Sequence, residues 1–215
     1  MNPVKFDYDY TAFWLKTPGY LIADVPEEVK SELKDSLSKV TSTSEEVGHL
    51  LKGHIHSEYN IPITENVKYY FESMSEEYDD FFWKNTAGSR TSEIYKTPEM
   101  EYRLEHLWVN YAVKHDFNPM HNHSGSYSFV VWVKIPYDLN EELKKYNPNG
   151  NETSCFNIHY PSPLGGIDTR NFYLDRDWEW KVAFFPSQLS HSVNPFYTSD
   201  DIRISIAGNV FLRHK

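Results

Sequence analysis

The stretch NPMHNHSG, residues 118–125, places two imidazole side chains, His121 and His123, two positions apart. In an extended chain, alternate side chains point to the same side, so both rings could reach one metal ion. Imidazole is a common ligand for iron, zinc, copper and nickel. Such a pair is also frequent at ordinary protein surfaces. The prediction of a metal site therefore depends on whether the chain supplies further partners.

The segment FFPSQLSHSVNPFYTSDDIRISIAGN, residues 184–209, contains candidates for these partners. His191 follows an apolar run and a proline turn, where a side chain can face a cavity. Arg203 and Ser205 are expected to share one face of the last strand, because apolar residues occupy the other face. A guanidinium among buried residues indicates a bound anion, and its natural bidentate partner is a carboxylate. The alternative is an edge-strand arginine that pairs with the preceding Ser-Asp-Asp turn.

Two kinds of element must position these residues. Residues 25–40 and 63–84 show apolar positions at helical spacing, and both are predicted to be helices. Runs of β-branched and aromatic residues predict strands over 104–113, 126–136, 178–186 and 202–212. Because the helices come early and the strands come late, the sequence favours an α+β fold.

Composition limits the function classes. The chain has 215 residues, which favours one domain, and its formal net charge of -10 disfavours nucleic acid and anionic membranes as partners. No signal peptide and no apolar run of about 20 residues is present, which predicts a soluble cytoplasmic protein. The single cysteine, Cys155, allows neither an internal disulfide nor a cysteine-based zinc site.

The order of these features resembles the 2-oxoglutarate- and Fe(II)-dependent oxygenases. The chain carries a His-x-His, a strand, a long excursion over about 137–178, a strand with a histidine, and an Arg-x-Ser on the last strand. The likeness is nearest to the prolyl-hydroxylase-like oxygenases of T4-like phages and cyanophages. It covers most of the chain from about residue 45, and residues 184–209 are its most specific part.

This resemblance implies a fold, a chemistry and a domain plan. The fold would be a double-stranded β-helix, jelly-roll or cupin-like, with N-terminal helices packed on it. Residues 1–215 would form a single oxygenase domain, in which 1–100 are mainly a helical support region and 101–215 are the β-helix core. The protein would use Fe(II) and 2-oxoglutarate to hydroxylate an amino-acid, peptidyl or other small substrate. The excursion and the N-terminal helices would supply substrate contacts.

The resemblance also implies roles for individual residues. His121 would be the first metal ligand and His191 the distal one. Arg203 would bind the far carboxylate of 2-oxoglutarate, assisted by Ser205. Further candidates for the cosubstrate pocket are Tyr111, Asn110 and Ser128.

The metal motif departs from the family pattern, in which an Asp or Glu follows two positions after the first histidine. In one register, His121, His123 and His191 form a three-histidine site that leaves the iron with one more unit of positive charge. In the other register, His123 is the first ligand and Gly125 takes the place of the carboxylate. That arrangement resembles the halogenases of this superfamily, whose vacant position accepts chloride. The first register is preferred.

Two other classes remain open at this point. A cupin-type metalloenzyme would bind metal but not 2-oxoglutarate, and Arg203 with Ser205 argues against it. A non-enzymatic β-sandwich binding module would need neither His191 nor Arg203 for its function. The oxygenase interpretation predicts a small-molecule or peptide substrate, a monomer or homodimer, and the host cytoplasm if the chain is phage-encoded. A second pair, His54 and His56, is expected to be a solvated connection away from the β half.

Overall fold

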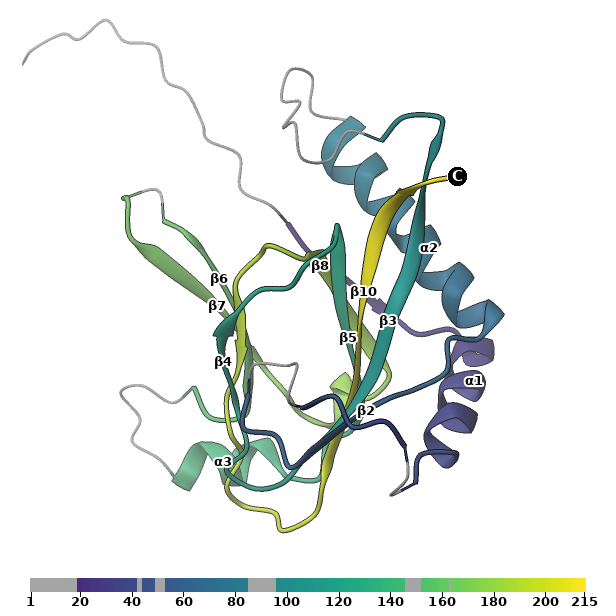
Figure 1. Cartoon of the computed structure of the whole chain (residues 1–215). Helices are drawn as coiled ribbons and strands as arrows, with labels where there is room; N and C mark the ends of the chain where they lie inside the picture. Colours follow the sequence, from purple (N-terminus) through teal and green to yellow (C-terminus); the bar gives the residue numbers. More distant parts are fainter. Residues whose placement is uncertain (1–18, 42–43, 49–52, 85–95, 146–151, 163) are drawn as a thin grey trace, which may run out of the picture.

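The computed structural model describes residues 19–41, 44–48, 53–84, 96–145, 152–162 and 164–215 (Figure 1). The helices are α1 (Glu27–Ser38), α2 (Glu65–Asp79) with a π-helical extension (Asp80–Lys84), α3 (Leu139–Lys145) and a 3-10 turn (Arg176–Trp178). The strands are β1 (Leu21–Asp24), β2 (Ser57–Asn60), β3 (Met100–Ala112), β4 (Asn118–His121), β5 (Tyr127–Lys134), β6 (Cys155–Pro161), β7 (Ile167–Tyr173), β8 (Lys181–Pro186), β9 (His191–Val193) and β10 (Arg203–His214).

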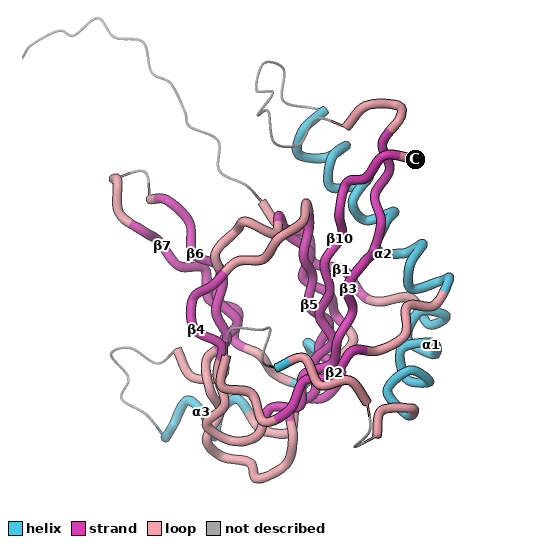
Figure 2. The backbone as a smooth tube through the Cα atoms, viewed as in Figure 1, coloured by secondary structure: helices cyan, strands magenta, loops and turns pink. Residues whose placement is uncertain are grey.

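The strands form two antiparallel sheets that face each other (Figure 2). The larger sheet has the strand order β1-β8-β5-β10-β3-β2, and the smaller has the order β4-β9-β6-β7. The chain crosses repeatedly between the two sheets, since β5 and β8 lie in the larger sheet while β6 and β7, between them in sequence, lie in the smaller. This arrangement is a double-stranded β-helix, and the predicted fold is confirmed.

Helices α1 and α2 cover the outer face of the larger sheet (Figure 1). Pro26 precedes α1, and Glu27 and Glu28 in its first turn suit the positive end of the helix dipole. Thr64 occupies the N-cap of α2, but its hydroxyl donates to Glu32 of α1 instead of capping the backbone. The two helices are therefore joined by a side-chain hydrogen bond as well as by packing.

An aromatic contact joins α2 to the larger sheet. The ring of Phe71 in α2 stacks on Phe129 of β5, with ring centroids 3.5 Å apart. Gly208 of β10 permits this packing, because a Cβ at that position would lie 2.5 Å from the Phe129 ring. Together with the buried positions of α1, this contact forms the first of two apolar cores.

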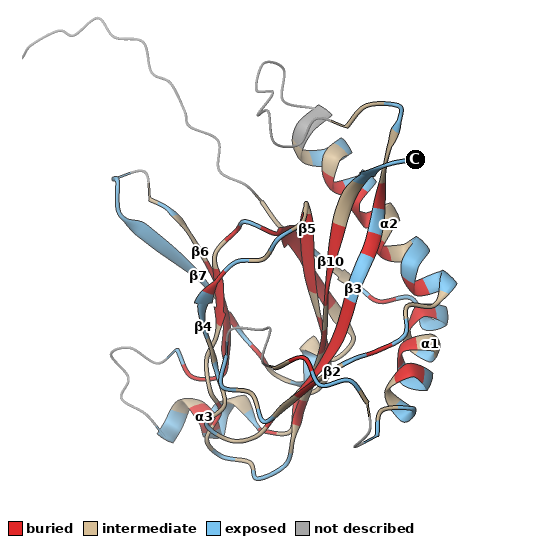
Figure 3. Ribbon diagram, in the orientation of Figure 1, coloured by how far each residue is buried: buried red, intermediate tan, exposed pale blue. Residues whose placement is uncertain are grey.

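The second core lies between the two sheets and includes Trp132, Phe156, Phe185 and Phe196. Because helices cover one face of the larger sheet and the smaller sheet covers the other, central strands are buried on both sides (Figure 3). Four consecutive residues of β3, positions 107–110, are buried for this reason. Within the described residues, no helix is both long and apolar enough to cross a membrane.

Three local features differ from the sequence predictions. The first hundred residues supply β1 and β2 to the larger sheet and are more than a helical support. The His54–His56 segment was expected away from the β half. That prediction is wrong, because His54 forms a β-bridge with Phe117 and the chain continues directly into β2. The excursion over 137–178 contains α3 and the β6–β7 pair, two strands of the smaller sheet.

Candidate metal and cosubstrate site

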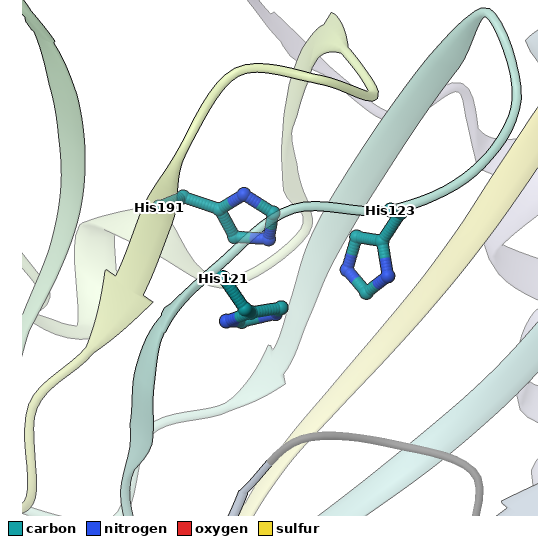
Figure 4. A group of neighbouring side chains, drawn as sticks. All are labelled: His121, His123 and His191. Carbon is teal, nitrogen blue, oxygen red and sulfur yellow. The ribbon is translucent and has the colours of Figure 1, made fainter.

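Three histidines converge on the inner side of the smaller sheet (Figure 4). His121 ends β4, His191 begins β9, and these two residues are direct partners in the β4–β9 pairing. His123 follows in the turn after β4, and its backbone N–H donates to Ser187 O at 2.9 Å. The candidate ligand atoms of the three rings all lie within 4.8 Å of one another. Strand pairing therefore assembles the cluster that the sequence predicted.

Backbone carbonyls orient two of the rings. Nδ1 of His121 lies 2.7 Å from Pro119 O, and Nδ1 of His191 lies 2.9 Å from Leu189 O. Since a carbonyl only accepts, each Nδ1 is assigned as the protonated nitrogen and each Nε2 as the candidate ligand atom. Such hydrogen bonds fix the tautomer and the direction of a metal-binding imidazole.

The environment keeps the rings in the form that binds metal. Burial, together with the charge of His121, lowers the pKa of His123 to about 4 and that of His191 to about 3. A neutral imidazole is the ligand form, so both rings are ready for a cation at neutral pH. Three imidazole nitrogens suit iron, zinc or copper. Within the described part of the chain, no carboxylate joins this group.

The backbone at Gly125 bears on the choice between the two registers. Gly125 has φ +107°, and a Cβ placed there would lie 2.9 Å from the backbone O of Val210 in β10. A side chain at position 125 would therefore point toward β10, and Gly125 does not line the pocket that contains the histidines. This geometry favours the three-histidine register over a His-x-Gly site.

We predict that Gly125→Ala lowers the free energy of unfolding by about 1–3 kcal/mol, because a non-glycine residue is strained at this φ and crowds Val210 O. The iron affinity of the variant should stay within about twofold of that of the parent, because position 125 does not line the pocket that holds the histidines. Chemical denaturation and an iron titration measure the two effects. Loss of iron binding without loss of stability would instead support the halogenase-like register.

Arg203 lies at the start of β10 and is only 3% exposed. Its Nη1 donates to Asn194 O at 3.4 Å, and the guanidinium carbon lies 5.2 Å from the centroid of the Phe196 ring. Tyr137 also lies beside it: burial raises the pKa of this phenol, and the charge of Arg203 opposes that rise. The guanidinium is thus held in place by a carbonyl and aromatic rings.

No carboxylate neutralises this buried charge among the described residues. The acids that the sequence offered as partners, Asp200 and Asp201, pair with Lys114 and Lys134 instead. A buried guanidinium without an anion is costly, and a carboxylate is its natural bidentate ligand. Arg203 therefore fits one carboxylate group of 2-oxoglutarate.

A pocket between the sheets connects Arg203 with the three histidines, and its empty space is about 720 Å³ including the part open to solvent. Ser205, Asn110 and Ser128 also line it, so the structure brings these predicted residues together. The Asn110 side-chain amide donates to the Ser205 hydroxyl at 3.3 Å. The buried Ser128 hydroxyl donates a hydrogen bond to Oδ1 of Asn209, at 2.7 Å.

Tyr111 does not join these residues. It pairs with Ile204 on the helix-covered face of the larger sheet, whereas its neighbour Asn110 pairs with Ser205 on the pocket face. The ring centroids of Tyr111 and Tyr59 are 6.2 Å apart, and Tyr111 packs against the first apolar core. The expected contact of Tyr111 with the cosubstrate is therefore wrong, because successive strand residues point to opposite faces.

Sequence reasoning missed the part of the pocket that β2 and its approach contribute. Ile55 and Glu58 line the pocket, and Trp108 of β3 lines it beside them. His54 and His56 are exposed and do not belong to the metal cluster. The four residues of β2 show no hydrophobic alternation, and no sequence signal indicated that Glu58 would be buried.

Comparison with known proteins agrees with this site. Residues 106–209 match the model of a family described as "Putative 2OG-Fe(II) oxygenase". This segment contains all three histidines, Arg203 and Ser205. No curated protein sequence matches the chain. The segment that carries the candidate site therefore matches the 2OG-Fe(II) oxygenases, which use Fe(II) and 2-oxoglutarate as metal and cosubstrate, and the double-stranded β-helix of the chain is consistent with this match.

Three solved structures of oxygenases are similar to the chain at low identity. An oxidoreductase of the 2OG-Fe(II) oxygenase family from Burkholderia pseudomallei has 12% identity and a TM-score of 0.50, over 90% of this chain and 85% of that one. A viral collagen prolyl hydroxylase from Paramecium bursaria Chlorella virus-1, in complex with 2OG, has 11% identity and a TM-score of 0.48, over 89% and 94%. A prolyl-4-hydroxylase from Pseudomonas putida has 10% identity and a TM-score of 0.45, over 93% and 94%. The expected closeness to phage oxygenases stays a prediction.

Proposed function

We propose that this protein is a hydroxylase in which His121, His123 and His191 hold Fe(II). Arg203 and Ser205 bind the far carboxylate of 2-oxoglutarate, and Asn110 orients the Ser205 hydroxyl. The observation that carries this assignment is one pocket that contains both a cluster of three imidazoles and a buried guanidinium without an anion among the described residues. The cosubstrate needs both features, since it has a metal-chelating keto-acid end and a free carboxylate.

When bound, Fe(II) and 2-oxoglutarate would couple the reduction of dioxygen to the decarboxylation of 2-oxoglutarate to succinate and CO2, with one oxygen atom incorporated into succinate and the other inserted into a substrate C–H bond. The protein supplies position and a shielded pocket. Arg203 and Ser205 fix one end of the cosubstrate, which directs the other end toward the histidines. Phe156 and Phe185 line the pocket near His191 and reduce the access of water.

The three-histidine set gives this site a distinctive charge. A carboxylate ligand would cancel one positive charge of Fe(II), whereas His123 cancels none. The iron should therefore attract the 2-oxoglutarate dianion more strongly than a two-histidine, one-carboxylate site does. A cupin-type enzyme would leave the charge of Arg203 unused, and the family match also favours the oxygenase.

We further propose that residues 1–215 act as one oxygenase domain. Helices α1 and α2 contact the sheet that carries Arg203 through a shared apolar core. The lining of the pocket, which combines imidazoles and a guanidinium with aromatic rings, suits a small molecule or a peptide side chain.

The test is an oxygen-free titration of the purified protein with Fe(II) and then with 2-oxoglutarate. A visible metal-to-ligand charge-transfer band should appear only when both are present, and admission of oxygen should yield succinate. Zinc in place of iron is the control, because it can fill the site but gives no such band. A protein that binds iron and shows no band with 2-oxoglutarate would contradict the proposed cosubstrate site.

A further inference from the structure

Glu58 is a buried carboxylate that the proposed mechanism does not use. It lies in β2 at the edge of the larger sheet, is 4% exposed, and lines the same pocket as the histidines and Arg203. Its register partner is Asn110, whose own partner in β10 is Ser205. Since direct partners in paired strands share a face, these three side chains form a row across the pocket wall.

The carboxylate of Glu58 has no hydrogen bond or ion pair from any described residue. Burial, together with the nearby charges of Asp116 and Glu46, raises its pKa to about 7. Arg203 lines the same pocket but forms no salt bridge with Glu58. A carboxylate in this position is unfavourable unless a cation or a hydrogen-bond donor enters the pocket.

A second hydrogen-bond acceptor lines the pocket without a donor. Asn118 of β4 contributes to the lining, and its Oδ1 is buried with no hydrogen-bond partner. The segment that leads into β2 lies beside Asn118, since a Cβ added at Gly53 would lie 2.1 Å from Asn118 Oδ1, and Ile55 of this segment lines the pocket. The described wall on this side therefore offers acceptors and negative charge.

The two charged side chains, Arg203 and Glu58, lie on different strands of the pocket wall. In the proposed function, 2-oxoglutarate occupies Arg203 and Ser205, one strand inward from Asn110. Glu58 lies one strand outward from Asn110, at the sheet edge. We propose that Glu58 binds a protonated amine of the substrate, so that the enzyme hydroxylates an organic ammonium compound. This inference rests on the proposed function, because iron and cosubstrate define the space that is left.

The experiment uses the charge-transfer band of the oxygen-free Fe(II)–2-oxoglutarate protein, because a molecule that binds beside the iron perturbs this band. The probes are the free L-amino acids other than arginine and histidine, together with short lysine peptides, each compared with a form acetylated on every amine, which lacks the positive charge. The variants are Glu58→Gln, which keeps shape and removes charge, and Glu46→Gln. Glu46 is an exposed acid close to Glu58 that does not line the pocket.

At least one amine should perturb the band of the parent, and its acetylated form should not. Glu58→Gln should weaken this response about tenfold or more, since a charge-assisted hydrogen bond is lost, while Glu46→Gln should change it less than about twofold. Equal responses to free and acetylated probes would overturn the proposal, as would no response to any amine. Both results leave the proposed function intact, because the band itself is present. Absence of the band in the parent contradicts the proposed function first.

Discussion

Replacement of His191 by alanine should abolish detectable iron binding and all 2-oxoglutarate-dependent succinate formation. His191 is 5% exposed, is paired with His121 across two strands, and offers one of the three candidate ligand nitrogens. Loss of a partner that only orients a ligand typically weakens metal affinity 10- to 100-fold. Loss of the ligand itself should therefore weaken it more than about 100-fold. Iron titration by visible spectroscopy and by metal analysis after gel filtration measures this effect.

His159→Ala is the matched control for this variant. His159 lies in β6, whose Ile158 pairs directly with His191, yet its ring bonds the Ser192 and Thr169 hydroxyls and not the cluster. The His159→Ala variant should keep its iron affinity within about threefold of the parent, because it loses only hydrogen bonds outside the cluster. Circular dichroism of both variants checks that the fold persists. Full iron binding by folded His191→Ala would exclude the three-histidine site.

The predicted features that proved correct depend on strand alternation. The period of two placed Arg203 and Ser205 on one face and Ile204 on the other, and the structure shows this division. The same period explains the error at Tyr111, because a distance counted along the sequence does not settle which face a residue occupies. An offset of one position moves a side chain from the pocket to the helix-covered core.

The features that the sequence could not reveal depend on pairing between distant segments. Glu58 is buried only because β2 pairs with β3, and a four-residue edge strand has too few positions to show a pattern. The β6–β7 pair has the same origin: much of β7 is exposed, so its sequence lacks the apolar run of a core strand. His123, in contrast, could be identified from the sequence because it lies only two positions after His121.

Arg203→Ala should raise the 2-oxoglutarate concentration needed for half-maximal charge-transfer absorbance by about 100-fold. A buried charged pair that loses one partner typically costs about 2–5 kcal/mol, and each 1.4 kcal/mol is a factor of ten. Iron affinity without cosubstrate should not change, because the guanidinium does not belong to the ligand cluster. Arg203→Lys should give an intermediate value, since an ammonium keeps the charge but loses the bidentate geometry.

Lys134→Ala controls for the loss of a positive charge in the same sheet. Lys134 is the register partner of Ile204, but it is a surface residue paired with Asp201 and should change cosubstrate affinity less than about twofold. Thermal unfolding separates binding from structure. Saturating 2-oxoglutarate should stabilise the iron-loaded parent by RT ln(1 + [L]/Kd) and should hardly stabilise Arg203→Ala at the same concentration. The apoprotein should not depend on Arg203 for an ion pair, because no described carboxylate accompanies it. An apoprotein strongly destabilised by Arg203→Ala, with unchanged cosubstrate affinity, would make Arg203 a structural residue.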